Sequence, residues 1–489
     1  MKRLGIKISA GRVARNTAIL IALRVLLPAC GLLLVLSLSR HLGAEGLGRY
    51  SLVFGFLYFF NNVAPLGLAS VITRDGAKNR DAIQPTLANA LALSSVGSIA
   101  LAGIMAALGP LLNYDKETQL CLALTSLALL PFTIGTLFEG AFLALQKMQH
   151  VAAAMVLEYV IKVGGAIILL YLGLGLYAVL AMAILGRSLA CLLGAHLLAK
   201  EGIRVRWAPE PELMKHLARL APTFVLINVF ASLYWRVDLL MLSKMQPLVE
   251  VGYYSASYRV FDMAMVIPYS LCLALYPNIA SVIHSDAAAL RTLGRTVMRY
   301  LTALTLPAAV CTSVFSRQVL ELLYGPGFGS AAPTLAVLMW TLVFYGLVRY
   351  HAFVLLAANR QRVDLVLNAA MLLVNVALNY FLIPRYSHLG AALATLSAIL
   401  AYGTLQYWYL ARYLRGYAAP IIIPPVVPIA SLAVGALVLW MQNMSALLVV
   451  PAAIAVYILI LLGGGFFTRE ELALIRVGRI FSVSGPPAE

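Results

Sequence analysis

Cationic side chains lie in the middle of long apolar stretches of this sequence, where they could bind phosphate: Arg24, Lys162, Arg187, Arg236, Arg259 and Arg349. A charge at the centre of a lipid-facing helix costs about 2.5–3.5 kcal/mol on insertion scales, so a cation at this depth is expected to face water or a partner. Arginine binds a phosphate group bidentately, and lysine binds it as a point charge. These residues are therefore predicted to line a solvated cavity that receives a phosphate-bearing ligand.

Acidic side chains also lie within the apolar stretches: Glu139, Glu158, Asp238 and Asp262. A carboxylate inside a membrane can bind Na⁺, or its pKa can shift far enough for it to carry a proton. These four residues are therefore candidates for ion coupling. Glu139 is the first of them, because no neighbouring residue in the sequence accounts for its charge.

Some of these acids are spaced to neutralise a cation on the same helix. Glu158 and Lys162 are four residues apart, and Arg259 and Asp262 are three apart, so each pair would share one helix face. For Lys162 and Arg259, ligand contact and structural pairing are therefore equally supported. The other cations without an obvious partner on their own helix favour the cavity: Arg24, Arg187 and Arg349.

The composition identifies the elements that must position these residues. Hydrophobic residues make up 62% of the 489 residues and charged residues 11%, and the mean hydropathy is +0.90. A soluble domain has about 45–50% apolar and about 25% charged residues, so this chain has more apolar surface than a soluble core could hide. Apolar stretches long enough to span a bilayer recur about fourteen times. The expected fold is an all-α, polytopic membrane protein.

The net charge of +17 fits a membrane topology better than nucleic-acid binding. Lysines and arginines gather in the gaps between apolar stretches, and most of them lie on the side that holds the N-terminus. Cytoplasmic loops of membrane proteins accumulate such residues. Both termini are therefore predicted to be cytoplasmic, and no nucleic-acid partner is expected.

The loops are too short for a soluble catalytic domain. A P-loop, a GxGxxG sequence that opens a helix, HExxH and GxSxG are all missing from suitable contexts. The five cysteines form no CxxC pair, which argues against a zinc site or a disulfide framework. The sequence therefore predicts a protein that is not an enzyme and has no cofactor, with H⁺ or Na⁺ as the candidate coupling ion.

Similar short segments recur in the two halves of the chain. Residues 48–51 (GRYS) resemble residues 252–255 (GYYS), and Gly175 and Gly390 open similar helices. An even number of predicted spans separates the members of each pair, so the halves would be parallel repeats with a pathway between them. The predicted regions are an N-terminal lobe over 1–205, a C-terminal lobe over 206–415, and two further helices with a cytoplasmic tail over 416–489.

This plan resembles the multidrug/oligosaccharidyl-lipid/polysaccharide exporter superfamily. Residues 40–50 (RHLGAEGLGRY), Gly67-Leu68 with residues 73–75 (TRD), and residues 252–256 (GYYSA) resemble its polysaccharide transporter and O-antigen flippase family. The resemblance implies a bacterial inner-membrane flippase that works by alternating access. It would move an undecaprenyl-pyrophosphate-linked oligosaccharide from the cytoplasmic to the periplasmic leaflet, with polysaccharide polymerase and assembly proteins as partners.

Other functions fit less well. A multidrug or small-cation antiporter of the same superfamily would be expected to carry an excess of acids in its pathway, whereas cations outnumber acids within these spans. A flippase for a peptidoglycan lipid precursor would also be cationic inside, and the sequence excludes it only weakly. A membrane polymerase or ligase would need larger external loops.

Overall fold

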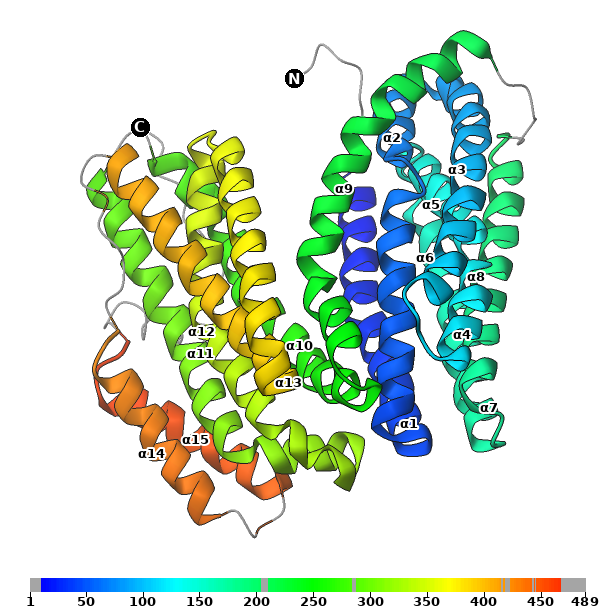
Figure 1. Cartoon of the computed structure of the whole chain (residues 1–489). Coiled ribbons are helices and arrows are strands. Elements are labelled where there is room, and N and C mark those ends of the chain that lie inside the picture. Colours follow the sequence, from blue (N-terminus) through cyan, green and yellow to red (C-terminus); the bar gives the residue numbers. More distant parts are fainter. Residues whose placement is uncertain are drawn as a thin grey trace, which may run out of the picture. The chain divides into compact units, whose positions relative to one another are not determined.

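The computed structural model describes residues 10–203, 210–283, 287–414, 417, 423–441, 444 and 446–467, and over these it is helical with no strand (Figure 1). The helices lie where the apolar runs lie, because a helix satisfies every backbone donor and acceptor within one apolar segment. Nine of the described helices or joined helix pairs are long and apolar enough to span a membrane, or ten if the bent pair of α1 and α2 counts as one span. The all-α membrane fold is confirmed, while the number fourteen and the orientation of the termini stay predictions.

The helices of the first half are α1 (Ala10–Val63), α2 (Leu68–Lys78), α3 (Ile83–Leu111), α4 (Lys116–Ser126), α5 (Leu129–Ala144), α6 (Met148–Tyr159), the π-helical turn η3 (Val160–Gly165), α7 (Ala166–Tyr171) and α8 (Gly175–Lys200). Those that follow are α9 (Pro211–Met245), α10 (Leu248–Val282), α11 (Ala287–Tyr324), α12 (Ala332–Ala357), α13 (Gln361–Tyr413), α14 (Val426–Trp440) and α15 (Ala446–Gly463).

Two long elements, α1 and α13, are each broken by one residue. Gly43 has φ 66° and ψ −166° inside α1, and Ser387 has φ 50° and ψ −132° inside α13. Positive φ values interrupt a right-handed helix, and only glycine adopts them without steric strain. Each break falls between two predicted spans, so α1 and α13 each correspond to a pair of the predicted apolar stretches.

The contacts divide the chain into two compact units. Unit 1 comprises Met1–Ser255 with Leu323–Gly327, and unit 2 comprises Ala256–Leu322 with Phe328–Glu489. This division places α9 and the beginning of α10 with the first unit, whereas the sequence analysis set the lobe boundary at residue 205. The predicted 1–205, 206–415 and 416–489 regions stay predictions.

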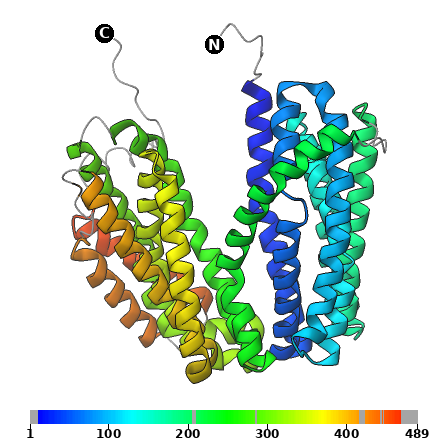
Figure 2. The same cartoon turned by 45° about the horizontal axis from the view of Figure 1, so that its top comes forward.

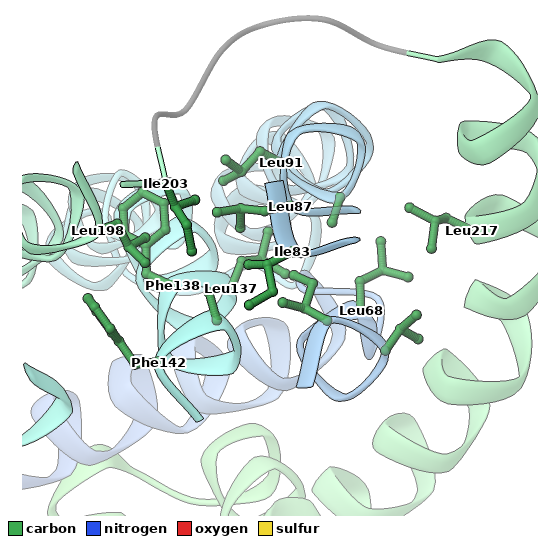
Figure 3. Close-up of a cluster of buried hydrophobic side chains, with 14 of the residues drawn as sticks. Leu68, Ile83, Leu87, Leu91, Leu137, Phe138, Phe142, Leu198, Ile203 and Leu217 are labelled. Atoms are coloured by element: carbon green, nitrogen blue, oxygen red, sulfur yellow. The ribbon is translucent and has the colours of Figure 1, made fainter. Parts of the chain in front are cut away.

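Unit 1 is built around α5, which packs against α3 and against α8 (Figures 1 and 2). Its core holds Leu68 of α2, Leu87 of α3, Phe138 of α5 and Leu198 of α8, and Leu217 of α9 reaches the same cluster (Figure 3). These side chains are 4% exposed or less. They fix the rotation of α5 and α8 about their axes, and so they fix the direction of the charged side chains on those helices.

The repeated glycines of the sequence meet within unit 1. A Cβ atom on Gly48 of α1 would overlap the carbonyl oxygen of Leu248, and one on Gly252 of α10 would overlap that of Ala44. Only glycine allows two helix backbones to approach this closely. The recurrence of glycine in these two segments therefore has a packing reason.

Unit 2 has its own cores. Cys272 of α10, Met298 of α11, Tyr350 of α12 and Leu410 of α13 pack in one cluster. A smaller cluster joins α11 to α14 and α15 through Ala303, Val427 and Leu461. The packing of α12 against α13 determines which residues of α12 face the interior of the unit.

Candidate ion and phosphate sites

Three charged side chains predicted for the site come together inside unit 1. Arg187 on α8 donates from Nη1 to Glu158 Oε2 on α6 at 2.9 Å and to Glu139 Oε1 on α5 at 3.2 Å. The Arg187 side chain is 8% exposed, that of Glu158 is 8% exposed, and that of Glu139 is 27% exposed. One cation therefore faces two carboxylates, and with all three ionised the cluster carries a net charge of −1.

The Arg187 guanidinium packs against α5 and donates a hydrogen bond to its backbone. Nη2 donates to the Phe132 carbonyl oxygen at 3.1 Å and contacts Thr136 Oγ1 at 3.5 Å, and the group lies 4.7 Å from the centre of the Phe132 ring. A Cβ atom on Gly135 would come within 2.7 Å of Nη2. Gly135 therefore leaves the space in which the guanidinium lies flat against α5.

The structure gives Arg187 two partners on other helices. Sequence spacing could only reveal partners on the same helix, whereas Glu139 and Glu158 come from other helices, 48 and 29 residues away. Most hydrogen-bonding capacity of Arg187 is used within the protein, so this residue is better suited to holding the two acids than to receiving a phosphate. A cavity of about 10 Å³ beside Glu139 and Arg187 has room for about one water molecule.

Lys162 lies in the π-helical turn that follows Glu158. Glu158 and Lys162 lie four residues apart across the start of this turn, Val160–Gly165, and the pairing of their side chains stays a prediction. Val163 within the turn and Glu158 before it are both buried. The Lys162 ammonium lies 4.9 Å from the centre of the Phe54 ring on α1, which shows that it is directed toward α1.

Arg236 on α9 also lies over an aromatic ring of α1. Its guanidinium carbon is 5.0 Å from the centre of the Tyr58 ring, and its buried Nε has no hydrogen-bond partner in the described part of the chain. Asp238, two residues later, accepts a hydrogen bond from the Tyr254 hydroxyl at 3.0 Å. Phe54 and Tyr58 are one helical turn apart, so α1 presents two rings to two cations.

Unit 2 holds Arg349 in a cage of aromatic rings. The centres of the Tyr269, Phe353 and Tyr345 rings lie 5.1, 5.7 and 5.9 Å from its guanidinium carbon. Its buried Nε has no hydrogen-bond partner, and within the described ranges it forms no ion pair with a carboxylate. The rings therefore hold the Arg349 guanidinium without neutralising its positive charge.

The other predicted residues are placed less fully. Arg259 and Asp262 are both half-buried on α10 within unit 2. Arg24 falls in α1, but its side chain lies outside the described residues. The structure therefore brings together Arg187, Glu139 and Glu158, and it places Lys162, Arg236 and Arg349 in separate aromatic settings.

Sequence reasoning missed the aromatic partners of the cations. Phe54 and Tyr58 are spaced by four residues, which is a detectable signal, but aromatic residues are common throughout this chain. Sequence reasoning also missed Gly135. The need for glycine at this position is visible only when the Arg187 guanidinium is seen to pack against it.

Charged clusters outside the spans serve to join helix ends. Arg49 lies within 3.3 Å of Glu45, Asp115 and Glu117, which fastens α1 to the beginning of α4. Glu201, just after α8, accepts from Lys147 Nζ at 2.8 Å and contacts His150 Nε2 at 3.0 Å. The hydrogen bond from Lys147, with a further one from His150, lowers the pKa of the Glu201 carboxyl.

The sequence is similar to known polysaccharide transporters and flippases. A family model described as polysaccharide biosynthesis protein matches residues 13–283, and one described as lipid II flippase MurJ matches residues 184–460. A Shigella flexneri protein named as an O-antigen transporter is 21% identical over 398 residues, which are 78% of this chain and 93% of that protein. A Haloferax volcanii protein named as the flippase AglR is 23% identical over 435 residues, which are 87% of this chain and 88% of that protein.

Solved structures share the helical architecture. The lipid II flippase MurJ in an inward closed conformation has a TM-score of 0.74 at 14% identity, over 94% of this chain and all of that one. An inward-facing multidrug resistance transporter of the MATE family has a TM-score of 0.63 at 15% identity, over 80% of this chain and 96% of that one. At these identities the likeness concerns the fold.

Proposed function

Because this chain belongs to the polysaccharide biosynthesis protein family, among the polysaccharide transporters of the multidrug/oligosaccharidyl-lipid/polysaccharide exporter superfamily, we propose that it flips an undecaprenyl-pyrophosphate-linked oligosaccharide. The direction is from the cytoplasmic to the periplasmic leaflet of the bacterial inner membrane, by alternating access. Polysaccharide polymerase and assembly proteins would take up the product. The matches to transporters and flippases, together with the many apolar helices, support a multi-pass membrane transporter.

The observation that carries this proposal is the pairing of in-span cations with aromatic rings. Arg236 on Tyr58 and Arg349 on Tyr269, Tyr345 and Phe353 are held in place without a carboxylate among their described contacts. An aromatic face stabilises a cation by about 0.5–2 kcal/mol and does not neutralise it. The charge is therefore available to a pyrophosphate, and exposed ring surface, such as that of Tyr58 or Tyr269, suits a sugar.

The cluster of Arg187, Glu139 and Glu158 supports ion coupling at a different place. Its excess negative charge is balanced by one monovalent cation, and a proton needs no coordination shell beyond the carboxylates themselves. Glu139 is the more accessible acid, so it is the group that we assign to exchange with solvent. Asp238 and Asp262 remain the further candidates for this role.

The test replaces each ring-held cation by glutamine in a cell that depends on this chain for its surface polysaccharide. Arg236→Gln and Arg349→Gln should insert normally and abolish surface polysaccharide, because each removes a phosphate contact and leaves no buried acid unpaired. Arg317→Gln is the matched control, since Arg317 is 72% exposed and pairs with Glu321 on its own helix. Normal polysaccharide in both site variants would refute the proposal.

A second candidate substrate is the lipid-linked peptidoglycan precursor. The match of residues 184–460 to the MurJ family model is the specific observation in its favour. The two candidates share the pyrophosphate and differ in the sugar. Rescue of a strain depleted of its own lipid II flippase would identify this chain as a peptidoglycan precursor flippase, and failure to rescue, together with restored polysaccharide, would identify the first substrate.

A further inference from the structure

A half-buried carboxylate lies within unit 2, between the two arms into which Ser387 divides α13. Asp364, in the first turn of the first arm, accepts hydrogen bonds at Oδ1 from the Tyr402 hydroxyl at 2.7 Å and from Gln406 Nε2 at 2.9 Å. Asn368, one turn after Asp364, brings its Nδ2 within 3.4 Å of Oδ2 and also contacts the Tyr402 hydroxyl. Three neutral side chains therefore surround this carboxylate.

The negative charge of Asp364 has no cation beside it. Over the ranges that the structure describes, no lysine or arginine forms an ion pair with this carboxylate. The two arginines that precede it are directed elsewhere, since the Arg360 guanidinium lies 4.2 Å from the centre of the Tyr413 ring and Arg362 is exposed. A charge withdrawn from water is costly unless it is paired, and a carboxylate in a membrane helix is a candidate functional group for this reason.

The same side chains can supply oxygen ligands. Gln406 is fully buried, and its Oε1 has no hydrogen-bond partner in the described part of the chain. A half-turn of the amide exchanges Nε2 and Oε1, so the oxygen without a partner would then face Asp364. The Asn368 amide can turn in the same way, and the Tyr402 hydroxyl oxygen already contacts both Asp364 and Asn368. Asp364 is thus surrounded by groups that donate to it directly, or that can share a cation with it.

The composition of this group selects the kind of cation. Carboxylate and amide oxygens are ligands of hard cations, whereas transition metals favour histidine and cysteine. Among the described residues, no three histidine, cysteine or acidic side chains gather as a metal centre would require. A single carboxylate balances one positive charge, so the group suits a monovalent ion.

The internal repeat gives this site a counterpart in unit 1. Residues 183–185 (AIL) of α8 match residues 398–400 (AIL) of α13, and Arg187 and Tyr402 each follow two residues later. Each of these two side chains donates to a carboxylate on the preceding span of its own unit. Unit 1 combines one cation with two carboxylates, and unit 2 combines neutral donors with one carboxylate. With the acids ionised, both sites therefore carry a net charge of −1.

We propose that Asp364, Asn368, Tyr402 and Gln406 bind one Na⁺ between the two arms of α13. Asp364 and Asn368 supply ligands from the first arm, and Tyr402 and Gln406 supply them from the second, so the ion fastens the arms together. Half-buried Asp364 is the point of entry, and fully buried Gln406 closes the inner side. This site is separate from the cluster of unit 1 and goes beyond the proposed function, because it holds for either candidate substrate.

The experiment measures the thermal unfolding midpoint of the purified full chain in detergent at neutral pH, while NaCl replaces choline chloride at constant ionic strength. An ion that binds only the folded chain raises the midpoint by an amount that grows with the ion concentration. The unmodified chain should show this rise, and Asp364→Asn should abolish it. Tyr402→Phe keeps the ring and removes one ligand oxygen, so it should weaken the apparent Na⁺ affinity by about fivefold or more. Asp81→Asn, at an exposed acid of unit 1, is the matched control and should keep the full rise.

Each result decides for or against the site. Absence of a Na⁺-dependent rise in the unmodified chain would overturn the proposal, and so would an undiminished rise in Asp364→Asn. If Asp364→Asn is not monodisperse after extraction, Tyr402→Phe carries the test, and an unchanged affinity in that variant would also overturn it.

Glu139→Gln distinguishes the two units. A full rise in this variant supports the site in unit 2, whereas loss of the rise there, with retention in Asp364→Asn, would move the ion to the cluster of unit 1. None of these measurements involves transport, so failure of this proposal would leave the proposed function standing, and the polysaccharide assay tests that function separately.

Discussion

Arg187 and Arg349 carry the same predicted role and occupy opposite environments. Arg187 in unit 1 is fixed by two carboxylates, a carbonyl oxygen and a glycine that makes room for it. Arg349 in unit 2 is surrounded by three aromatic rings. The carboxylates neutralise the positive charge of Arg187, whereas the rings leave the charge of Arg349 unneutralised. Whether a cation at bilayer depth can bind a ligand therefore depends on the groups around it. Its depth alone does not indicate a binding role.

The largest expected effect separates these two residues by stability. Arg187→Met leaves Glu139 and Glu158 buried without their cation, and breaking a buried pair in this way costs about 3–5 kcal/mol. Arg349→Met removes ring contacts and should cost about 0.5–2 kcal/mol. The measurement is the fraction of folded, monodisperse protein after detergent extraction, followed by the thermal unfolding midpoint of each variant.

A triple variant is the control for this difference. Arg187→Met combined with Glu139→Gln and Glu158→Gln removes the cation and both charges, so it should recover most of the lost stability. It should nevertheless lose pH-dependent transport. Equal stability losses in Arg187→Met and Arg349→Met would show that the two environments are energetically alike, and the comparison would fail.

Glycines beside the two arginines give the next largest effect. Gly135→Ala places a methyl group within 2.7 Å of the Arg187 guanidinium, and overpacking of this kind costs about 1–3 kcal/mol. Gly346→Ala on the helix of Arg349 meets only Leu301, at an ordinary 3.5 Å, and should stabilise α12 by about 0.5–1 kcal/mol. The unfolding midpoint should therefore fall in Gly135→Ala and rise in Gly346→Ala. A shift in the same direction for both would argue against close packing of the Arg187 guanidinium on α5.

The aromatic rings that contact the in-span cations give a smaller effect. Tyr58→Leu removes the ring beneath Arg236 and should cost about 0.5–1 kcal/mol of stability, because the site is partly exposed. Tyr58→Phe keeps the ring and should leave stability unchanged. Transport should follow the same order if the ring holds Arg236 for the substrate. A loss with Tyr58→Phe that matches Tyr58→Leu would assign the effect to the hydroxyl group instead.

The fold was largely predictable, since an excess of apolar residues and their run lengths admit only helices that span a bilayer. The site was predictable only as a set of residue types. Sequence spacing could not join Arg187 to Glu139 and Glu158, because the packing of α5, α6 and α8 creates that contact. It also could not place the Lys162 ammonium against the Phe54 ring, because the packing of α1 beside the π-helical turn creates that contact.

The smallest effect concerns the contacts of Glu201 with Lys147 and His150, which lie outside the spans. Water screens these electrostatic interactions, whereas the interior of unit 1 screens those of Arg187 much less. Hydrogen bonds from Lys147 and His150 lower the pKa of Glu201 below its ordinary value of about 4.3. A carboxyl whose folded pKa is lowered adds stability above its ordinary pKa and loses it as the pH falls through the folded value. The midpoint difference between the unmodified chain and Glu201→Gln should therefore be small at neutral pH and should vanish as the pH falls through the lowered folded pKa of Glu201. Glu212→Gln, an exposed acid at the start of α9, is the control. A difference that persists in acid would mean that Glu201 acts through packing, and the contrast between screened and enclosed charges would then apply only to Arg187.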